Sequence, residues 1–176
     1  MASMSGRCRN PLTPVGPADG LHVVPAGPAD LGALVALDHA CFGGRAWAAS
    51  HWRELLATTG VRVTLVRGDD GPVAASVLLS DPPRAHLASL AVLPAWRRHG
   101  LGRFLLGAAV ARASAAGARW LLLEVDADNA DALRLYRRAD LVATRRFREE
   151  CRVRLEMVRR IGGRRSRGAL AMMPPA

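Results

Sequence analysis

The segment LAVLPAWRRHGLGR, residues 90–103, predicts an apolar strand, a loop rich in arginine and glycine, and the start of a helix. The strand ends in Leu90, Ala91 and Val92, and the helix continues from Arg103. Backbone N–H groups at a helix start have no partner inside the helix and lie at the positive end of the helix dipole, so they bind phosphate well. The segment therefore predicts an anion site.

The spacing within this loop excludes two familiar phosphate loops. The dinucleotide fingerprint Gly-x-Gly-x-x-Gly needs a third small residue where this chain has Leu105. The nucleotide P-loop needs a longer spacing between its glycines, followed by Lys and then Ser or Thr, and this loop has neither. What remains is the pattern Arg-x-x-Gly-x-Gly at Arg97, Gly100 and Gly102. The alternative is a capped turn between a core strand and a core helix.

A second segment, LEVDADNADALRLY at residues 123–136, predicts another strand and another helix. The apolar run 118–125 favours a strand buried on both faces, where the carboxylate of Glu124 must be paired, hydrated or functional. The helix begins near Asn129, and helical spacing places Tyr136 on its inward face, toward the strand that carries Glu124.

Together, the two segments resemble the GNAT superfamily of acetyl-CoA-dependent N-acetyltransferases, over about residues 21–158. The similarity is closest to the branch that acetylates the N-terminal alanine of a ribosomal protein. The resemblance implies an α/β (α+β) fold with a mixed, mostly antiparallel sheet of about six or seven strands, flanked by helices. It also implies a bulge in the strand before the loop and a V-shaped splay that takes acetyl-CoA.

The same resemblance implies the site residues. Glu124 is the expected base and Tyr136 the expected acid. N–H groups of 98–103 are expected to hold the pyrophosphate, Asn129 to contact the pantetheine arm, and the strand end to position the thioester. The expected acetyl-CoA contacts are Leu90, Ala91, Val92, Arg97, Arg98, His99, Gly100, Leu101, Gly102, Arg103 and Asn129.

The reaction expected is direct attack of an amine on the thioester. Neither segment contains a Cys that could form a covalent intermediate, and the five His show no ligand spacing that would indicate a metal. An α-amine with pKa about 8 is neutral, and therefore nucleophilic, far more often at pH 7 than a lysine amine with pKa about 10.4. This favours a protein N-terminus, such as that of a ribosomal protein, as acceptor.

Two alternatives remain open from the sequence. One is an acetyltransferase for a small amine such as an aminoglycoside, a polyamine or an amino acid, which an acidic acceptor pocket would favour. The other is a catalytically silent acetyl-CoA-binding or RNA-associated module. The basic end supports the second, because residues 134–167 hold thirteen Arg and four acidic residues of a chain with net charge +10. Tyr136 and Phe147 are the only aromatics there, so weak or non-specific nucleic-acid contact is expected.

Composition predicts one domain of 176 residues in a reducing cytoplasm. The chain has no membrane-length apolar run, no apolar stretch near Met1 that would indicate a signal peptide, and three Cys without a Cys-x-x-Cys pair. We expect a disordered N-terminal extension at 1–20, the acetyltransferase domain at 21–160 and a basic disordered tail at 161–176.

The remaining predictions concern local structure. Strands are expected at 21–24, 61–65, 73–79, 86–92 and 151–157, and helices from Pro28 and over 51–57, the latter with Ser50 as N-cap. Phe42, Trp47 and Trp52 are expected either to shape an acceptor pocket or to fill the core. Asp140-Leu141 stands where the family has Gly and an aromatic residue, and Asp can adopt the left-handed turn at some cost.

Overall fold

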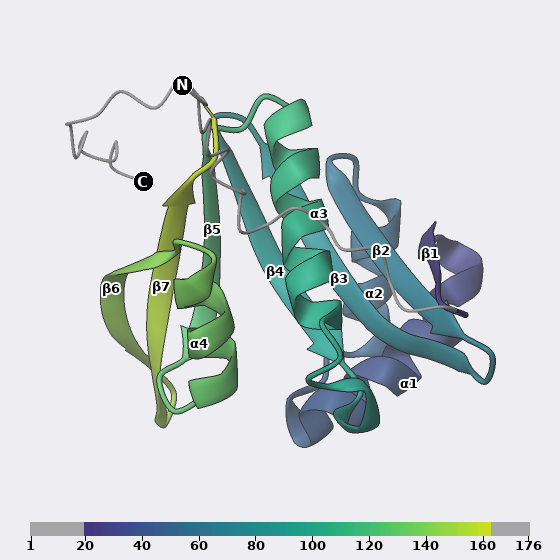
Figure 1. Ribbon diagram of the computed structural model, residues 1–176. Helices are drawn as coiled ribbons and strands as arrows, with labels where there is room; N and C mark the ends of the chain where they lie inside the picture. The colour runs from purple at the N-terminus through teal and green to yellow at the C-terminus, as the bar shows by residue number, and fades with distance from the viewer. Residues whose placement is uncertain (1–19, 163–176) are drawn as a thin grey trace, which may run out of the picture.

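The computed structural model describes residues 20–162, which form one seven-stranded sheet with helices on both faces (Figure 1). The predictions for residues 1–20 and 161–176 lie outside the described residues, apart from Gly20, Ile161 and Gly162. The strands are β1 (His22–Pro25), β2 (Val61–Gly68), β3 (Gly71–Asp81), β4 (Arg84–Val92), β5 (Trp120–Asp126), β6 (Val142–Glu149) and β7 (Arg152–Arg160). The main helices are α1 (Leu31–Phe42), α2 (Ala49–Ala57), α3 (Leu101–Ala115) and α4 (Ala130–Arg138), with short 3-10 turns η1 (Pro28–Asp30), η2 (Gly43–Arg45) and η3 (Pro94–Trp96).

The strand order is β1-β2-β3-β4-β5-β7-β6, and every neighbouring pair is antiparallel except β4 and β5. The turn Gly68–Gly71 joins β2 to β3 as a hairpin, as the alternating pattern predicts. The expected mixed, mostly antiparallel sheet is therefore confirmed.

Each face of the sheet has its own core. On one face, α3 and α4 pack with Leu106, Leu121 and Leu123 into a buried cluster that includes Tyr136. On the other face, α1 and α2 cover β2 and β3, with Trp52 at the centre. Figure 1 shows α3 and α4 in front of the strands and α1 and α2 behind them. The β5–β7–β6 part of the second face is not covered by α1 and α2, which leaves its polar side chains accessible.

The sheet splits between β4 and β5. These strands pair only over Arg84–His86 with Trp120–Leu122, and both then continue without pairing to each other. In the pairing of β4 with β3, Val77 lies opposite Ser89 and Leu78 opposite Leu87, so Ala88 is an extra residue that forms a bulge. The two halves diverge from that end in Figure 1. The bulge and the V-shaped splay implied by the resemblance are confirmed.

The sequence misses one strand, and two local predictions are wrong. Strand β6 was not expected, because its side chains are exposed or half-buried and its sequence, VATRRFRE, lacks the apolar alternation that reveals a strand. Strand β5 is buried on one face only, and Glu124 on its other face is exposed. Helix α2 begins at Ala49 with Ala48 as N-cap, so Ser50 lies inside its first turn.

The turn after α4 survives its unusual sequence. Asp140 adopts φ +59°, in the left-handed region. The N–H of Leu141 donates to the Tyr136 carbonyl at 3.1 Å, and that of Asp140 donates to Arg137 at 3.1 Å. These two bonds form the Schellman motif that glycine normally allows. Leu141 is buried in the same cluster as Tyr136, so the turn fixes the end of the helix that carries this side chain.

Candidate active site

The loop between β4 and α3 has the backbone of an anion site. The hydrogen-bond ladder of α3 begins at Phe104, whose N–H donates to the carbonyl of the N-cap residue Gly100 at 2.9 Å. The N–H groups of Leu101 and Gly102 precede it, in the first turn, where a helix supplies no acceptor. The Leu101 side chain is buried, which means that this residue can offer a ligand only its backbone. Arg97, Arg98, His99 and Arg103 are exposed around it.

The two glycines of the loop have different roles. Gly100 caps α3 at φ +85°, and a Cβ there would meet no atom within 4 Å, so its backbone conformation is what requires glycine. A Cβ at Gly102 would lie 3.2 Å from Cδ2 of Leu135 on α4. Gly102 therefore allows close approach of α3 and α4 across the split. Arg98 adopts φ +69°, which is strained for a residue with a side chain.

The two sequence segments meet at this point. Arg98 Nη1 lies 3.9 Å from the Asp131 carboxylate at the start of α4, and both side chains are well exposed. Asn129 caps α4, accepting the N–H of Ala132 on its side-chain oxygen at 3.1 Å. Its amide NH₂ group remains a donor for a ligand. Arg97 Nε donates to the Val92 carbonyl at 3.2 Å, which ties the loop to the end of β4.

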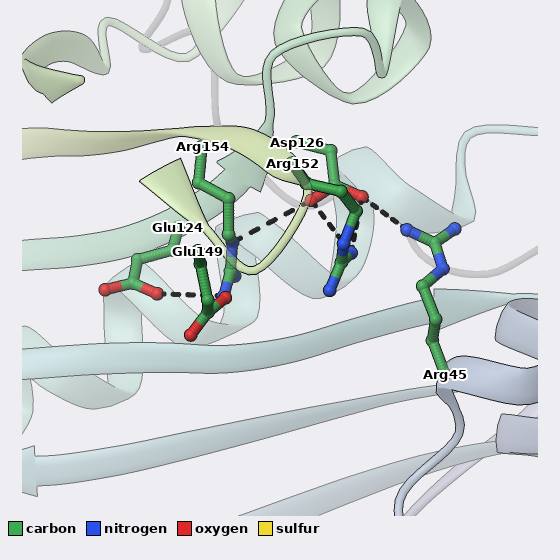
Figure 2. A network of polar contacts seen from close by, with 6 residues as sticks. All are labelled: Arg45, Glu124, Asp126, Glu149, Arg152 and Arg154. Atoms are coloured by element: carbon green, nitrogen blue, oxygen red, sulfur yellow. Dashed lines mark hydrogen bonds and ion pairs between the residues drawn. The ribbon is translucent and has the colours of Figure 1, made fainter. Parts of the chain in front are cut away.

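Glu124 is held by arginine. Its Oε2 lies 3.3 Å from Arg154 Nη1, and the same nitrogen donates to Glu149 (Figure 2). The Glu124 side chain is 36% exposed. The expectation that this carboxylate must be paired, hydrated or functional is thus met by pairing and exposure together, and neither excludes a catalytic role.

Asp126, two residues further along β5, is more fully engaged. Its side chain is 15% exposed and accepts Arg152 Nη1 at 3.0 and 3.1 Å. Arg45, from the turn η2 after α1, donates to it from the other half of the molecule (Figure 2). The Arg45–Asp126 pair thereby links the α1–α2 segment to β5 and β7.

Tyr136 is buried, with 8% of its surface exposed. Burial raises the pKa of its hydroxyl to about 12, so the group is protonated throughout the neutral range. The side chain packs in the cluster with Leu123 and Val125 of β5, whereas Glu124 points to the opposite face. The predicted acid and base thus lie on two sides of the sheet, and the split between β4 and β5 is where a single substrate could reach both.

A cavity of about 350 Å³ opens on the Glu124 face, where β4 and β5 last pair. Its lining includes the charged side chains of Asp81, Arg84, Glu124 and Glu156, and the imidazole of His86. Three carboxylates against one arginine suit a cationic amine. The sequence analysis missed His86, because a single histidine in an apolar strand is no motif. The only available signal was that it lies six residues before Val92, at the start of the strand that leads to the phosphate loop.

The aromatic residues near α2 belong to the core. Trp52 is 1% exposed and packs against Trp47 at 5.3 Å between ring centroids. The backbone N–H of Trp47 donates at 2.6 Å to Asp38, a buried carboxylate that the sequence analysis also missed. Burial raises the pKa of the Asp38 carboxyl, and this hydrogen bond opposes the rise. The bond fixes the segment between α1 and α2, from which Arg45 extends.

Cysteine and metal chemistry have no evident site among residues 20–162. Cys41 is half-buried on α1, and burial raises the pKa of its thiol, while Cys151 is exposed in the β6–β7 turn. In this part of the chain, no three His, Cys, Asp or Glu side chains are grouped to hold a metal ion. None of its helices is long and apolar enough to cross a membrane.

The split, mostly antiparallel sheet with helices on both faces is the fold of the GNAT acetyltransferases. The sequence model of the acetyltransferase (GNAT) family matches residues 33–140, and the chain belongs to this family. No curated protein matches the sequence.

Similar solved structures agree in fold. The ribosomal-protein-S18-alanine N-acetyltransferase of Escherichia coli is 21% identical, with a TM-score of 0.74 over 83% of this chain and 98% of that one. Ard1 of Thermoplasma volcanium is 17% identical, with a TM-score of 0.73 over 82% and 99%. The yncA protein of Salmonella typhimurium, solved with its cofactor acetyl-CoA, is 18% identical, with a TM-score of 0.68 over 86% and 99%. At these identities the similarity shows the fold alone.

Proposed function

We propose that the protein transfers an acetyl group from acetyl-CoA to a primary amine, with the α-amine of a protein N-terminus as the leading acceptor. The observation that carries the proposal is the meeting of the Arg97–Arg103 loop, Glu124 and Tyr136 around one split in the sheet. A family match and an acetyl-CoA-bound structure of the same fold support the donor.

The residues present fit acetyl-CoA. The N–H groups of Leu101–Arg103, with exposed arginines beside them, suit a pyrophosphate. The edge of β4 from Leu87 to Val92 has no pairing with β5, so its backbone groups can bond the amides of the pantetheine arm. One N–H of Leu90–Val92 polarises the thioester carbonyl, and Asn129 contacts the arm through its amide.

In the proposed reaction the amine attacks the thioester carbon directly. Glu124 supports removal of the proton from the ammonium group, directly or through water, and Tyr136 protonates the departing thiolate. A hydroxyl with a pKa of about 12 is fully protonated at pH 7, as this role requires. Because the reaction needs a neutral amine, an α-amine, of which about a tenth is neutral at pH 7, is a better acceptor than a lysine side chain.

A small amine is the second candidate, and the acidic lining of the cavity favours it. Asp81, Glu124 and Glu156 face a volume of about 350 Å³, which accommodates a polyamine or part of an aminoglycoside. Such an acceptor would bind the carboxylates through several cationic groups, whereas a peptide would place only its N-terminus there.

The test is CoA release from acetyl-CoA with a panel of three acceptors: a peptide with a free N-terminal Ala, the same peptide N-blocked with an internal Lys, and spermidine. Turnover on the first alone supports an Nα-acetyltransferase, and turnover on spermidine alone moves the assignment to small amines. Acetyl-CoA binding without turnover on any of them would overturn catalysis and leave a silent acetyl-CoA-binding module. Glu124→Gln and Tyr136→Phe should lose turnover while keeping acetyl-CoA affinity.

A further inference from the structure

His86 lies at the vertex of the split sheet. It belongs to the last residue pair between β4 and β5, opposite Leu122, and Ala88 forms the bulge two residues later. The strands separate from this point, so His86 stands where a ligand lying in the split would end. Its side chain lines the cavity on the face that also presents Glu124.

The groups that face His86 come from four strands. They are Asp81 on β3, Arg84 on β4, Glu124 on β5, and Arg154 and Glu156 on β7. Glu156 lies opposite Glu124 in the β5–β7 pairing and accepts the Thr144 hydroxyl at 2.7 Å, while Glu124 is paired with Arg154. The His86 imidazole therefore shares the cavity with the carboxylates of Glu124 and Glu156, whose positions are fixed by Arg154 and Thr144.

The protonation state of His86 suits a proton acceptor. Burial lowers the pKa of its imidazole below the ordinary 6.5, and Glu124 and Glu156 oppose this shift while Arg154 adds to it. The ring is thus neutral at pH 7. A base works best when its pKa lies near the working pH, and carboxyl groups ordinarily titrate near pH 4, about two units below imidazole.

We propose that His86, in place of Glu124, is the general base of the reaction: it takes the proton from the acceptor ammonium group, and the role of Glu124 is to stabilise the imidazolium that forms. This inference rests on the proposed function. The ammonium N–H bond breaks and the proton passes to the imidazole, after which the neutral nitrogen forms its bond to the thioester carbon. As the carbon–sulfur bond breaks, Tyr136 gives its proton to the departing thiolate, and the second proton lost by the nitrogen restores the Tyr136 hydroxyl. Overall, R–NH₃⁺ and acetyl-S-CoA give R–NH–acetyl, CoA-SH and one proton, which His86 returns to solvent.

The kinetic test compares His86→Gln with the wild type, using the peptide with a free N-terminal Ala as acceptor. Wild-type kcat/KM should be nearly flat from about pH 6.5 to pH 8, the ordinary pKa values of imidazole and an α-amine. Without a base, only the neutral amine reacts, so the variant should rise tenfold per pH unit over this range. The expected loss is about tenfold at pH 7 and about thirtyfold at pH 6.5, since about a tenth and about three hundredths of an α-amine is neutral there.

Three controls separate this effect from misfolding. His22→Gln, on the distant strand β1, should leave kcat/KM and its pH profile unchanged. Acetyl-CoA affinity of His86→Gln should equal that of the wild type. Added imidazole should restore turnover to His86→Gly. A His86→Gln variant with the wild-type rate and profile would overturn the role of His86 and leave the transferase itself standing.

A second measurement needs no acceptor. In an NMR titration of the imidazole C–H signals, with His86 assigned from the spectrum of His86→Gln, its midpoint should lie below 6.5. Glu124→Gln should lower the His86 midpoint further, because it removes a carboxylate that stabilises the imidazolium. A midpoint at or above 6.5, or one that Glu124→Gln does not move, would overturn the proposal even if no panel acceptor reacts.

Discussion

The buried hydroxyl of Tyr136 leads to a titration that reports on one side chain alone. Tyr136 is the only tyrosine among the 176 residues, so the tyrosinate absorbance near 295 nm cannot come from any other residue. Burial raises the pKa of Tyr136 from 10.0 to about 12. At pH 10, about half of an ordinary tyrosine is ionised, whereas about one hundredth of Tyr136 should be.

The shift has a thermodynamic counterpart. A shift of two pKa units means that ionising Tyr136 costs about 2.7 kcal/mol more in the folded chain than in the unfolded chain. Because the pKa in the folded state is raised above its unfolded value, this stability is fully present below pH 10 and is lost as the pH rises from 10 to 12. The same shift means that ionisation of Tyr136 should cause no loss of transferase activity up to pH 10.

The assay is a spectrophotometric titration of the native protein, with far-UV circular dichroism recorded on the same samples and a parallel titration in guanidinium. We expect a midpoint near 12 for the folded chain and near 10 for the unfolded chain. Tyr136→Phe should abolish the signal. A native midpoint near 10, with the dichroism still that of the folded protein, would refute both the burial of the hydroxyl and its fitness as an acid.

Further predictions concern single contacts. Asp140→Gly should raise the free energy of unfolding by about 1 kcal/mol, because glycine removes the cost of the positive φ, and a lower melting temperature would contradict this. Asp126→Asn should lower the free energy of unfolding by about 1–2 kcal/mol in chemical denaturation, because Arg152 loses its anionic partner. Arg45→Ala should lower it by only about 0.5 kcal/mol, because Arg45 is exposed. Equal losses would contradict this difference in burial. The Gly27 N–H and Arg67 hold the pKa of Asp30 below its usual value. The stability that the Asp30 carboxylate contributes is therefore present above about pH 4 and is lost as the pH falls through the lowered pKa. Asp30→Asn should weaken the fall of the melting temperature with acidic pH.

The sequence predicted the elements that carry strong local signals. The strand–loop–helix segment around Gly100 and the start of α4 at Asn129 depend on residue types with specific backbone or capping roles, and both appear where expected. Strand β6 failed because an exposed edge strand has no buried face to impose alternation. The bulge at Ala88 came from the resemblance alone, since nothing in the residues of β4 or β3 specifies an unpaired position.

The site was only half predictable for a related reason. His86 has no motif around it, and its environment depends on the carboxylates that three other strands, β3, β5 and β7, bring to the same cavity. Likewise, the apolar run from Ala118 to Val125 suggested a doubly covered strand, because single-sequence reasoning cannot see that α1 and α2 end before they cover β5. The uncovered face is what leaves the Glu124 side chain exposed to solvent.

Glu124 and Asp126 show how the fold gives different functions to similar groups. Both carboxylates lie on the same face of β5, two residues apart, and sequence offers no physical reason to choose between them. Asp126 is bonded to Arg152 and Arg45 and is 15% exposed, so a proton or an ammonium group would have to displace strong partners to reach it. Glu124 has one arginine at 3.3 Å, is 36% exposed and opens onto the cavity shared with His86. Asp126 therefore holds the two halves of the site together, and Glu124 is the carboxylate that remains able to respond to a charge formed during the reaction.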